Sequence, residues 1–378
     1  MDTKKILTLD DLMDSPEKLP GLHELLEPAL PPEAPQTAEI PPEEEIRERP
    51  EPPAPLDLKS IKKVYSRIGW SLCAIFALVV LAQAIIIAIT PTDSWLLSSS
   101  TGTWLITFVP QYLLAMPVGL WLMKKLPTEA PTPVSMGKKN FWIFLAIGFF
   151  LTYTGSFLGN FLAGSLSDGS ADNLLDAYTM DTNPIKVLFL VILAPLFEEL
   201  VFRKAIIDRT RIYGEKMAVF LSAITFGLFH MNMYQFVYAF LLGGLYGYIY
   251  IRTGKLKYTV IMHGITNFVG GVIAPMVLSM VDLDVLASLE NQDSLLSSSL
   301  LTSEELISAA VYYGYVLMLL AVWIIGLVFF IKRVKRLVWK EVSTPLPANK
   351  RINTVFVNAG MLTFLILFSL LTLSSIAA

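Results

Sequence analysis

Charged side chains are scarce in this 378-residue sequence. Only 16% of its residues are Asp, Glu, Lys or Arg, whereas a soluble globular protein carries about 25%. Hydrophobic residues make up 54% of the chain. A lipid-facing surface has no water to solvate ionised groups. The shortage of charge therefore argues against an ordinary soluble domain and indicates a protein embedded in a bilayer.

Cysteine is almost absent as well. Cys73 is the only one, so the chain can form no internal disulfide and no thiolate metal cluster. Its apolar neighbours make it a small core residue. No GxSxG motif occurs, which leaves nucleophilic serine catalysis without support. The first 58 residues contain no apolar core of the length that a cleavable signal peptide needs.

Negative charge is concentrated at the N-terminus. Residues 1–58 hold 15 acidic and 5 basic residues and 12 of the 23 prolines, whereas the rest of the chain holds 24 basic and 17 acidic residues. So polar a segment cannot bury enough apolar surface to offset its ordering entropy. We predict a disordered acidic cytoplasmic tail over 1–58 and a transmembrane helical domain over 59–378. Nucleic-acid binding gains no support from this distribution.

Long apolar runs follow the tail at regular intervals. A helix needs about 20 residues to cross the hydrocarbon core. We predict an all-α polytopic bundle of about nine spans, near 69–89, 103–123, 141–163, 185–207, 217–232, 234–251, 258–279, 309–331 and 355–376. The fifth and sixth runs are short and nearly adjacent, so a tight hairpin or a re-entrant pair is an alternative, and eight spans are also compatible.

Loop charges indicate the orientation. The residues before the first run and the loops near 124–139, 203–216, 252–257 and 332–351 are basic, whereas the loops near 93, 168–181 and 282–305 are acidic. Basic loops favour the cytoplasmic side. Nine spans, with the N-terminus inside and the C-terminus outside, place every basic loop on the cytoplasmic side and every acidic loop outside. Seven spans do the same if the fifth and sixth runs both fail to cross. We predict a multi-pass protein of the cell membrane.

Two adjacent glutamates interrupt the fourth apolar run. An acid at the membrane centre costs about 2.5–3.5 kcal/mol, so Glu198 and Glu199 require partners. Arg203 follows Glu199 by four residues and shares its helical face. Glu198 points about 100° away. We predict that Glu199 pairs with Arg203 while Glu198 faces a cavity; the reverse assignment, or one site shared by both acids, also fits the spacing.

Polar residues interrupt two further runs. His230 ends the fifth run, and His263 and Asn267 lie four residues apart in the seventh, on one face of the helix. Buried polar groups are costly unless they meet one another, so we predict one shared polar cavity. At 1.5 Å per residue, His230 lies about 21 Å beyond Lys216. His263 lies only about 9 Å beyond Lys257 by the same rise. The fifth run must therefore be tilted, start below the surface or re-enter.

Backbone features accompany these side chains. Pro195 removes a donor one turn before Glu198, which predicts a kink in the fourth span. Gly243 and Gly247 form a GxxxG in the sixth, which predicts a close approach of a neighbouring helix.

Four chemical hypotheses fit such a cavity. A hydrolase would use a glutamate as general base on water, with His or Asn donors for the oxyanion. A zinc hydrolase would use His230, His263 and a glutamate, although no HExxH occurs. A transporter would use the carboxylates for ion coupling. A structural network would serve packing alone.

The motifs resemble those of a known family. EExxxR at 198–203, FxxxH at 226–230 and HxxxN at 263–267 occur in order on successive apolar runs. Together they are similar to the motifs of the CPBP family of intramembrane glutamic endopeptidases, which includes CAAX proteases and bacteriocin-processing and immunity proteins. The motif-bearing core extends over about 185–279.

The resemblance implies a mechanism. Glu198 would be the general base with His230 nearby, His263 and Asn267 would form the oxyanion site, and Glu199 and Arg203 would hold the geometry. It implies no metal and no other cofactor. The expected partner is a peptide or small membrane-protein substrate within the lipid bilayer. A non-catalytic scaffold, an immunity factor or a transporter of the same fold is the alternative function.

Overall fold

The computed structural model describes residues 56–168, 178, 180–281 and 302–377. All regular structure in these residues is helical, which confirms the all-α class. Most of the predicted disordered tail (1–58) and most of the acidic loop near 282–305 lie outside the described residues, so the tail remains a prediction.

Every predicted apolar run is largely helical, and the last of them is interrupted at Val357 and Asn358. Their bounds are α2 Leu58–Ile89, α3 Trp95–Ser98, α4 Ser100–Val109, η2 Pro110–Ala115, α5 Met116–Met123, α6 Lys138–Leu166, η3 Val187–Leu193, α8 Ala194–Glu198, η4 Glu199–Ala205, α9 Ile206–Thr210, η5 Arg211–Tyr213, α10 Glu215–Phe229, α11 Met233–Thr253, α12 Leu256–Phe268, η6 Val269–Ile273, α13 Ala274–Leu278, α16 Ser303–Val334, η7 Ala348–Lys350, α17 Arg351–Phe356 and α18 Ala359–Ser374. The segments η2, η3, η4 and η6 are π-helical. We call the run from η3 to α9 the motif helix.

The number of helices suited to crossing a membrane is smaller than the nine predicted. In the described part of the chain, five are long and apolar enough, or six if the pair η7–α17 and α18, bent by 69°, counts as one span. The other three runs are helical but differ from these spans in composition or length. The motif helix carries Glu198, Glu199 and Arg203, α10 has only 15 residues, and α11 contains five tyrosines. The motif helix and the end of α10 carry four of the six predicted site residues, and α12, one of the five candidate spans, carries His263 and Asn267.

The loops predicted to be cytoplasmic gather at one end of the bundle. Hydrogen bonds join them in pairs: Arg67 Nε to Leu122 O at 2.9 Å, Glu129 N to Asp208 O at 2.7 Å, Val134 N to Thr253 O at 2.7 Å, and Lys340 N to Glu215 Oε2 at 2.7 Å. We call this the basic end. At the opposite end, Trp104 Nε1 donates to Asp181 at 2.8 Å, and Met233 N donates to Ser375 Oγ at 3.0 Å. The predicted runs thus alternate in direction between the two ends.

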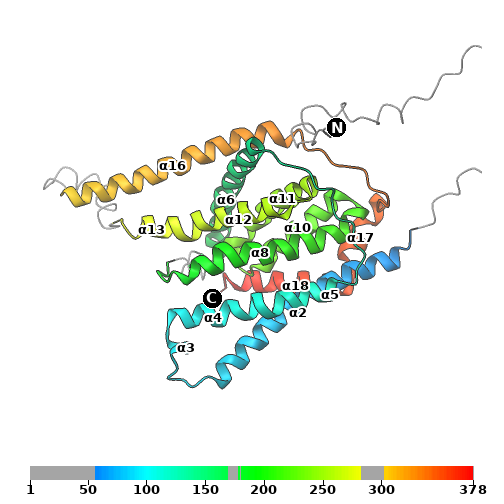
Figure 1. Cartoon of the computed structure of the whole chain (residues 1–378), viewed down its shortest axis with the longest axis horizontal. Coiled ribbons are helices and arrows are strands. Elements are labelled where there is room, and N and C mark those ends of the chain that lie inside the picture. The colour runs from blue at the N-terminus through cyan, green and yellow to red at the C-terminus, as the bar shows by residue number, and fades with distance from the viewer. Residues whose placement is uncertain (1–55, 169–177, 179, 282–301, 378) are drawn as a thin grey trace, which may run out of the picture.

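The helices form a layered bundle. α2, α5 and α18 pack together on one side, and α16 packs on α6 at the opposite side, with the motif helix, α10, α11 and α12 between them (Figure 1). Only 6% of the apolar stretch of α16 is buried, which makes it peripheral. The predicted close approach at the GxxxG is confirmed. A Cβ on Gly243 would lie 2.9 Å from Ala223 Cα, and one on Gly247 would lie 3.1 Å from Val219 Cγ1.

The alternation of ends predicts a topology that cysteine labelling can test. Replacing Cys73 by Ala removes the only thiol, and Thr128→Cys or Asp93→Cys then adds one at an exposed position. We expect an impermeant maleimide to label position 93 from outside intact cells and position 128 only in inverted vesicles. Labelling of both positions from one side would contradict the arrangement.

Candidate active site

The motif helix is continuous but not uniformly α-helical. The π-helical η3 ends at Leu193, two residues before Pro195, and the π-helical η4 begins at Glu199. π turns thus lie on both sides of α8, whereas the kink predicted at Pro195 stays a prediction. Such turns are rare and occur frequently at functional sites.

Glu199 and Arg203 form the predicted ion pair. Glu199 Oε1 lies 3.0 Å from Arg203 Nη2, and both side chains are fully buried. Helix α10 covers the guanidinium: its Cζ lies 4.3 Å from the ring centroid of Phe226, and Nη1 lies 3.5 Å from Ser222 Oγ. Ser222 Oγ in turn donates to the Phe202 carbonyl at 2.7 Å, which ties α10 to the motif helix.

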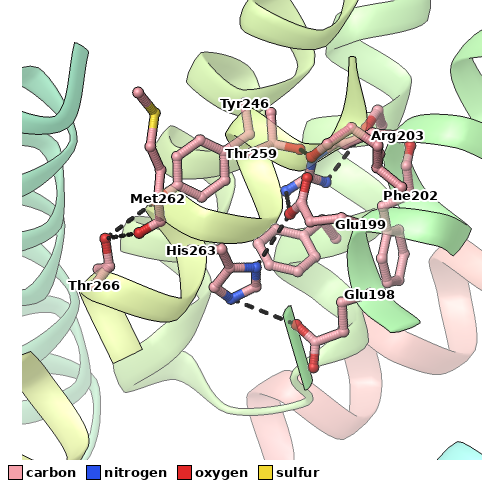
Figure 2. Close-up of polar contacts among 12 residues, drawn as sticks. Glu198, Glu199, Phe202, Arg203, Tyr246, Thr259, Met262, His263 and Thr266 are labelled. Carbon is pink, nitrogen blue, oxygen red and sulfur yellow. Dashed lines mark hydrogen bonds and ion pairs between the residues drawn. The ribbon is translucent and has the colours of Figure 1, made fainter. Parts of the chain in front are cut away.

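His263 connects both glutamates. Its Nδ1 lies 3.1 Å from Glu199 Oε1, and its Nε2 lies 3.7 Å from Glu198 Oε2 (Figure 2). The first distance is a hydrogen bond; the second is a contact between charged or polar groups that exceeds hydrogen-bonding distance. Because the Glu199 oxygen accepts, Nδ1 carries a proton. Nε2 is therefore the ring nitrogen that faces Glu198.

The two glutamates differ in exposure. The side chain of Glu199 is completely buried, whereas that of Glu198 is 13% exposed. Only Glu199 contacts Arg203 directly. The structure thus supports the predicted division, with one acid neutralised and the other facing accessible space, and it also brings both acids to one histidine.

His230 lies beside this network without a direct bond to Glu198 among the described residues. It follows the last residue of α10, where its Nδ1 donates to the Phe226 carbonyl at 2.8 Å. The Phe226 ring meets both histidines edge to face, with centroids 4.9 Å from His230 and 5.7 Å from His263. The predicted meeting of the two histidines therefore occurs around one aromatic ring, at the end of a helix of 15 residues.

Asn267 has a backbone partner that the sequence did not predict. Its Nδ2 donates to the Leu190 carbonyl at 2.9 Å. In η3 the N–H of Ala194 bonds to Phe189 O, and residue 195, the next in that pattern, is a proline without an N–H. Asn267 therefore satisfies a carbonyl that Pro195 leaves without a helical partner. An amide carries two N–H groups, so one N–H of Asn267 remains for another acceptor.

Tyr246 is a site neighbour that sequence reasoning missed. Its ring lies 5.9 Å from the Arg203 guanidinium and 5.8 Å from His263, and its hydroxyl lies 3.1 Å from Thr266 Oγ1. Spacing within α11 gave no signal for Tyr246, and spacing within α10 gave none for Ser222.

The zinc alternative lacks an assembled ligand set. Within residues 56–168, 178, 180–281 and 302–377, no three His, Cys, Asp or Glu side chains are placed to hold one metal ion. The set His230, His263 and Glu198, which spacing left open, is thus not gathered into a coordination sphere.

An apolar groove lies next to the site. It has a volume of about 440 Å³ and runs between the motif helix and α12. Leu196 and Gly264 line it, and these residues are close neighbours in sequence of Glu198 and His263. Ile192 and Ile261 at its margin are about half exposed. The groove offers an apolar surface beside the polar cluster.

The buried ion pair predicts an asymmetric response to mutation. Arg203→Leu leaves Glu199 charged, buried and uncompensated, so we expect a loss of roughly 3–5 kcal/mol in the free energy of unfolding. The double variant Glu199→Leu/Arg203→Leu should recover much of that loss. Thermal and denaturant unfolding in detergent measure the effect, with Arg336→Leu at an exposed position as the matched control. Equal stability of the single variant and the control would contradict the ion pair.

Comparison with known proteins agrees with the geometry. Residues 181–269, about a quarter of the chain, match the family model described as type II CAAX prenyl endopeptidase Rce1-like. No curated protein and no solved structure gives a significant match. The matched segment contains all six predicted site residues and the helices that carry them. This segment is thus similar to the Rce1-like CAAX prenyl endopeptidases that the family model describes.

Proposed function

We propose that this protein hydrolyses a peptide bond close to the membrane, with Glu198 as the general base on water. The observation that carries the proposal is that two adjacent glutamates differ in ion pairing and in exposure. Arg203 neutralises Glu199 within a fully buried pair, whereas Glu198 is partly exposed and faces Nε2 of His263. A base that must accept a proton needs access to water and freedom from a permanent cation, and Glu198 has both.

In the proposed reaction, Glu198 takes a proton from water as the water oxygen attacks the scissile carbonyl carbon. The developing oxyanion requires positioned donors. The second N–H of Asn267 is the nearest candidate. His263, on the same helix face, supplies a second donor at Nε2 when its ring is protonated, because Nδ1 already donates to Glu199. The C–N bond then breaks, and the proton held by Glu198 passes to the leaving amine, so the products are a carboxylic acid and an amine.

The remaining residues hold this arrangement. Glu199 accepts from His263 Nδ1 and thereby orients Nε2 toward Glu198. Arg203 keeps Glu199 ionised by proximity, and Phe226 and Ser222 hold Arg203 in place. His230 packs against Phe226, with ring centroids 4.9 Å apart, and we propose that it acts on the water or the leaving group once substrate is bound.

We propose a peptide or a small membrane protein as the substrate. The apolar groove between the motif helix and α12 suits an apolar segment next to the cleaved bond. A prenylated peptide, the substrate class in the name of the matching family, is one such ligand, and a hydrophobic leader segment is another.

The first test replaces the carboxylate of Glu198 by an amide of the same shape. We expect Glu198→Gln to lower turnover by about 10²- to 10⁴-fold, because the amide cannot accept the proton from water. Glu129→Gln, at an exposed position of the basic end, is the matched control. Comparing the termini of membrane proteins in cells that carry the native protein or the Glu198→Gln variant would identify the substrate. Cleavage that survives Glu198→Gln would contradict this mechanism, and a phenotype that survives without any cleavage would favour a scaffold.

A second test separates glutamate catalysis from zinc catalysis. We expect activity to persist after exhaustive treatment with a chelator that reaches the cavity, and elemental analysis of active protein to show well under one zinc per chain. A zinc site needs three protein ligands. Stoichiometric zinc, with activity lost on stripping and restored on return, would overturn the proposal.

A further inference from the structure

A second apolar groove lies away from the catalytic residues. It has a volume of about 410 Å³ and lies between α6, α10, α11 and α16. Helix α10 presents Ser222 and Phe226 to the catalytic site but Phe220 and Ala223 to this groove. The hairpin of α10 and α11 therefore separates the two spaces. We call the second space the α16 groove.

A glycine keeps the α16 groove open. A Cβ on Gly244 would meet no atom within 4 Å, whereas its neighbour Gly243 is closely packed against Ala223. Protein interiors are otherwise packed almost without voids. Phe220, which lines the groove, is 46% exposed, so the space opens on the surface of the bundle. In a bilayer, an open apolar space of this kind is filled by hydrocarbon.

The mouth of the α16 groove is basic. Lys216 at the start of α10 and Arg333 in the last turn of α16 both line it, and Trp339 lies beside them. One N–H of Arg333 donates to Asn140 Oδ1 at 3.1 Å. The Arg333 guanidinium keeps a positive charge at the mouth, because arginine stays protonated in proteins. Tryptophan is enriched at the membrane interface, where lipid headgroups lie.

The acidic residue nearest in sequence to Lys216 already has other partners. Glu215, adjacent to Lys216, is 3% exposed, pairs with Arg252 and accepts the backbone N–H of Lys340. The positive charge at the mouth is therefore not cancelled by this carboxylate. The groove combines an apolar body with a cationic end, at the end of the bundle where the basic loops gather.

We propose that the α16 groove binds one anionic phospholipid, with an acyl chain beside Gly244 and the phosphate between Lys216 and Arg333. Basic pockets between membrane helices bind anionic headgroups in this way. The bound lipid would fill the space between peripheral α16 and the α10–α11 hairpin. It would join the two through its headgroup and its chain. This inference does not depend on the catalytic proposal.

Lipid titration of the purified full-length protein tests the charged end. We expect native mass spectrometry to show that the first phosphatidylglycerol binds more tightly than phosphatidylcholine with identical chains. Lys216→Gln should weaken phosphatidylglycerol binding about fivefold and leave phosphatidylcholine binding unchanged. Lys125→Gln, at another exposed cation of the basic end, is the control and should change neither.

A second pair of variants tests the apolar end. Gly244→Leu fills the groove and should abolish the tight phosphatidylglycerol site. Gly314→Leu on α16 is the matched control, because a Cβ there also meets nothing within 4 Å and the residue does not line the groove. Equal affinities for the two lipids, equal behaviour of Lys216→Gln and Lys125→Gln, or a tight site retained in Gly244→Leu would each overturn the proposal. If Gly244→Leu does not fold, the comparison of Lys216→Gln with Lys125→Gln is sufficient to test the proposal.

Discussion

The buried ion pair of Glu199 and Arg203 is the constraint on which the bundle depends. Both side chains are fully buried, so their charges are stable only while they remain together and enclosed. Lipid cannot enclose them, and the motif helix must therefore lie among other helices. Helix α10 supplies Phe226 and Ser222 for the guanidinium, and α12 supplies His263 for the carboxylate. The long apolar helices, such as peripheral α16, are left to face the bilayer.

Helix geometry then gives two identical side chains different chemistry. Successive residues project about 100° apart, so the acid beside Glu199 cannot reach the same cation. Glu198 instead faces His263 from the partly exposed side. One imidazole thus has its Nδ1 fixed by a neutralised acid and its Nε2 directed at an accessible one. The orientation of His263 and the partial exposure of Glu198 thus follow from a single pair of adjacent residues.

Sequence reasoning reached those features that depend on local spacing or composition. The apolar runs predicted the long helical stretches, because a lipid-facing helix must be apolar along its length, but not the short α3, η5 and η7. The four-residue spacing predicted the pair of Glu199 and Arg203. It overcounted the helices suited to crossing the membrane, because the apolar pattern does not separate an inner helix with charges or tyrosines from a spanning one. The contacts of Ser222 and Tyr246 depend on helices that cross at particular angles, and spacing within one helix contains no information about them.

The contact between Asn267 and Leu190 shows how a backbone defect positions the site. Pro195 deprives one carbonyl of a helical partner, and an unpaired carbonyl in an apolar interior costs free energy. Asn267 supplies the missing donor from α12, one helical turn after His263. The same face of α12 thus holds the motif helix at two points, through Asn267 at a carbonyl and through His263 at a carboxylate. Because both points lie on one face, the register of α12 against the motif helix is set by polar contacts, and the distance from His263 to Glu198 follows from that register.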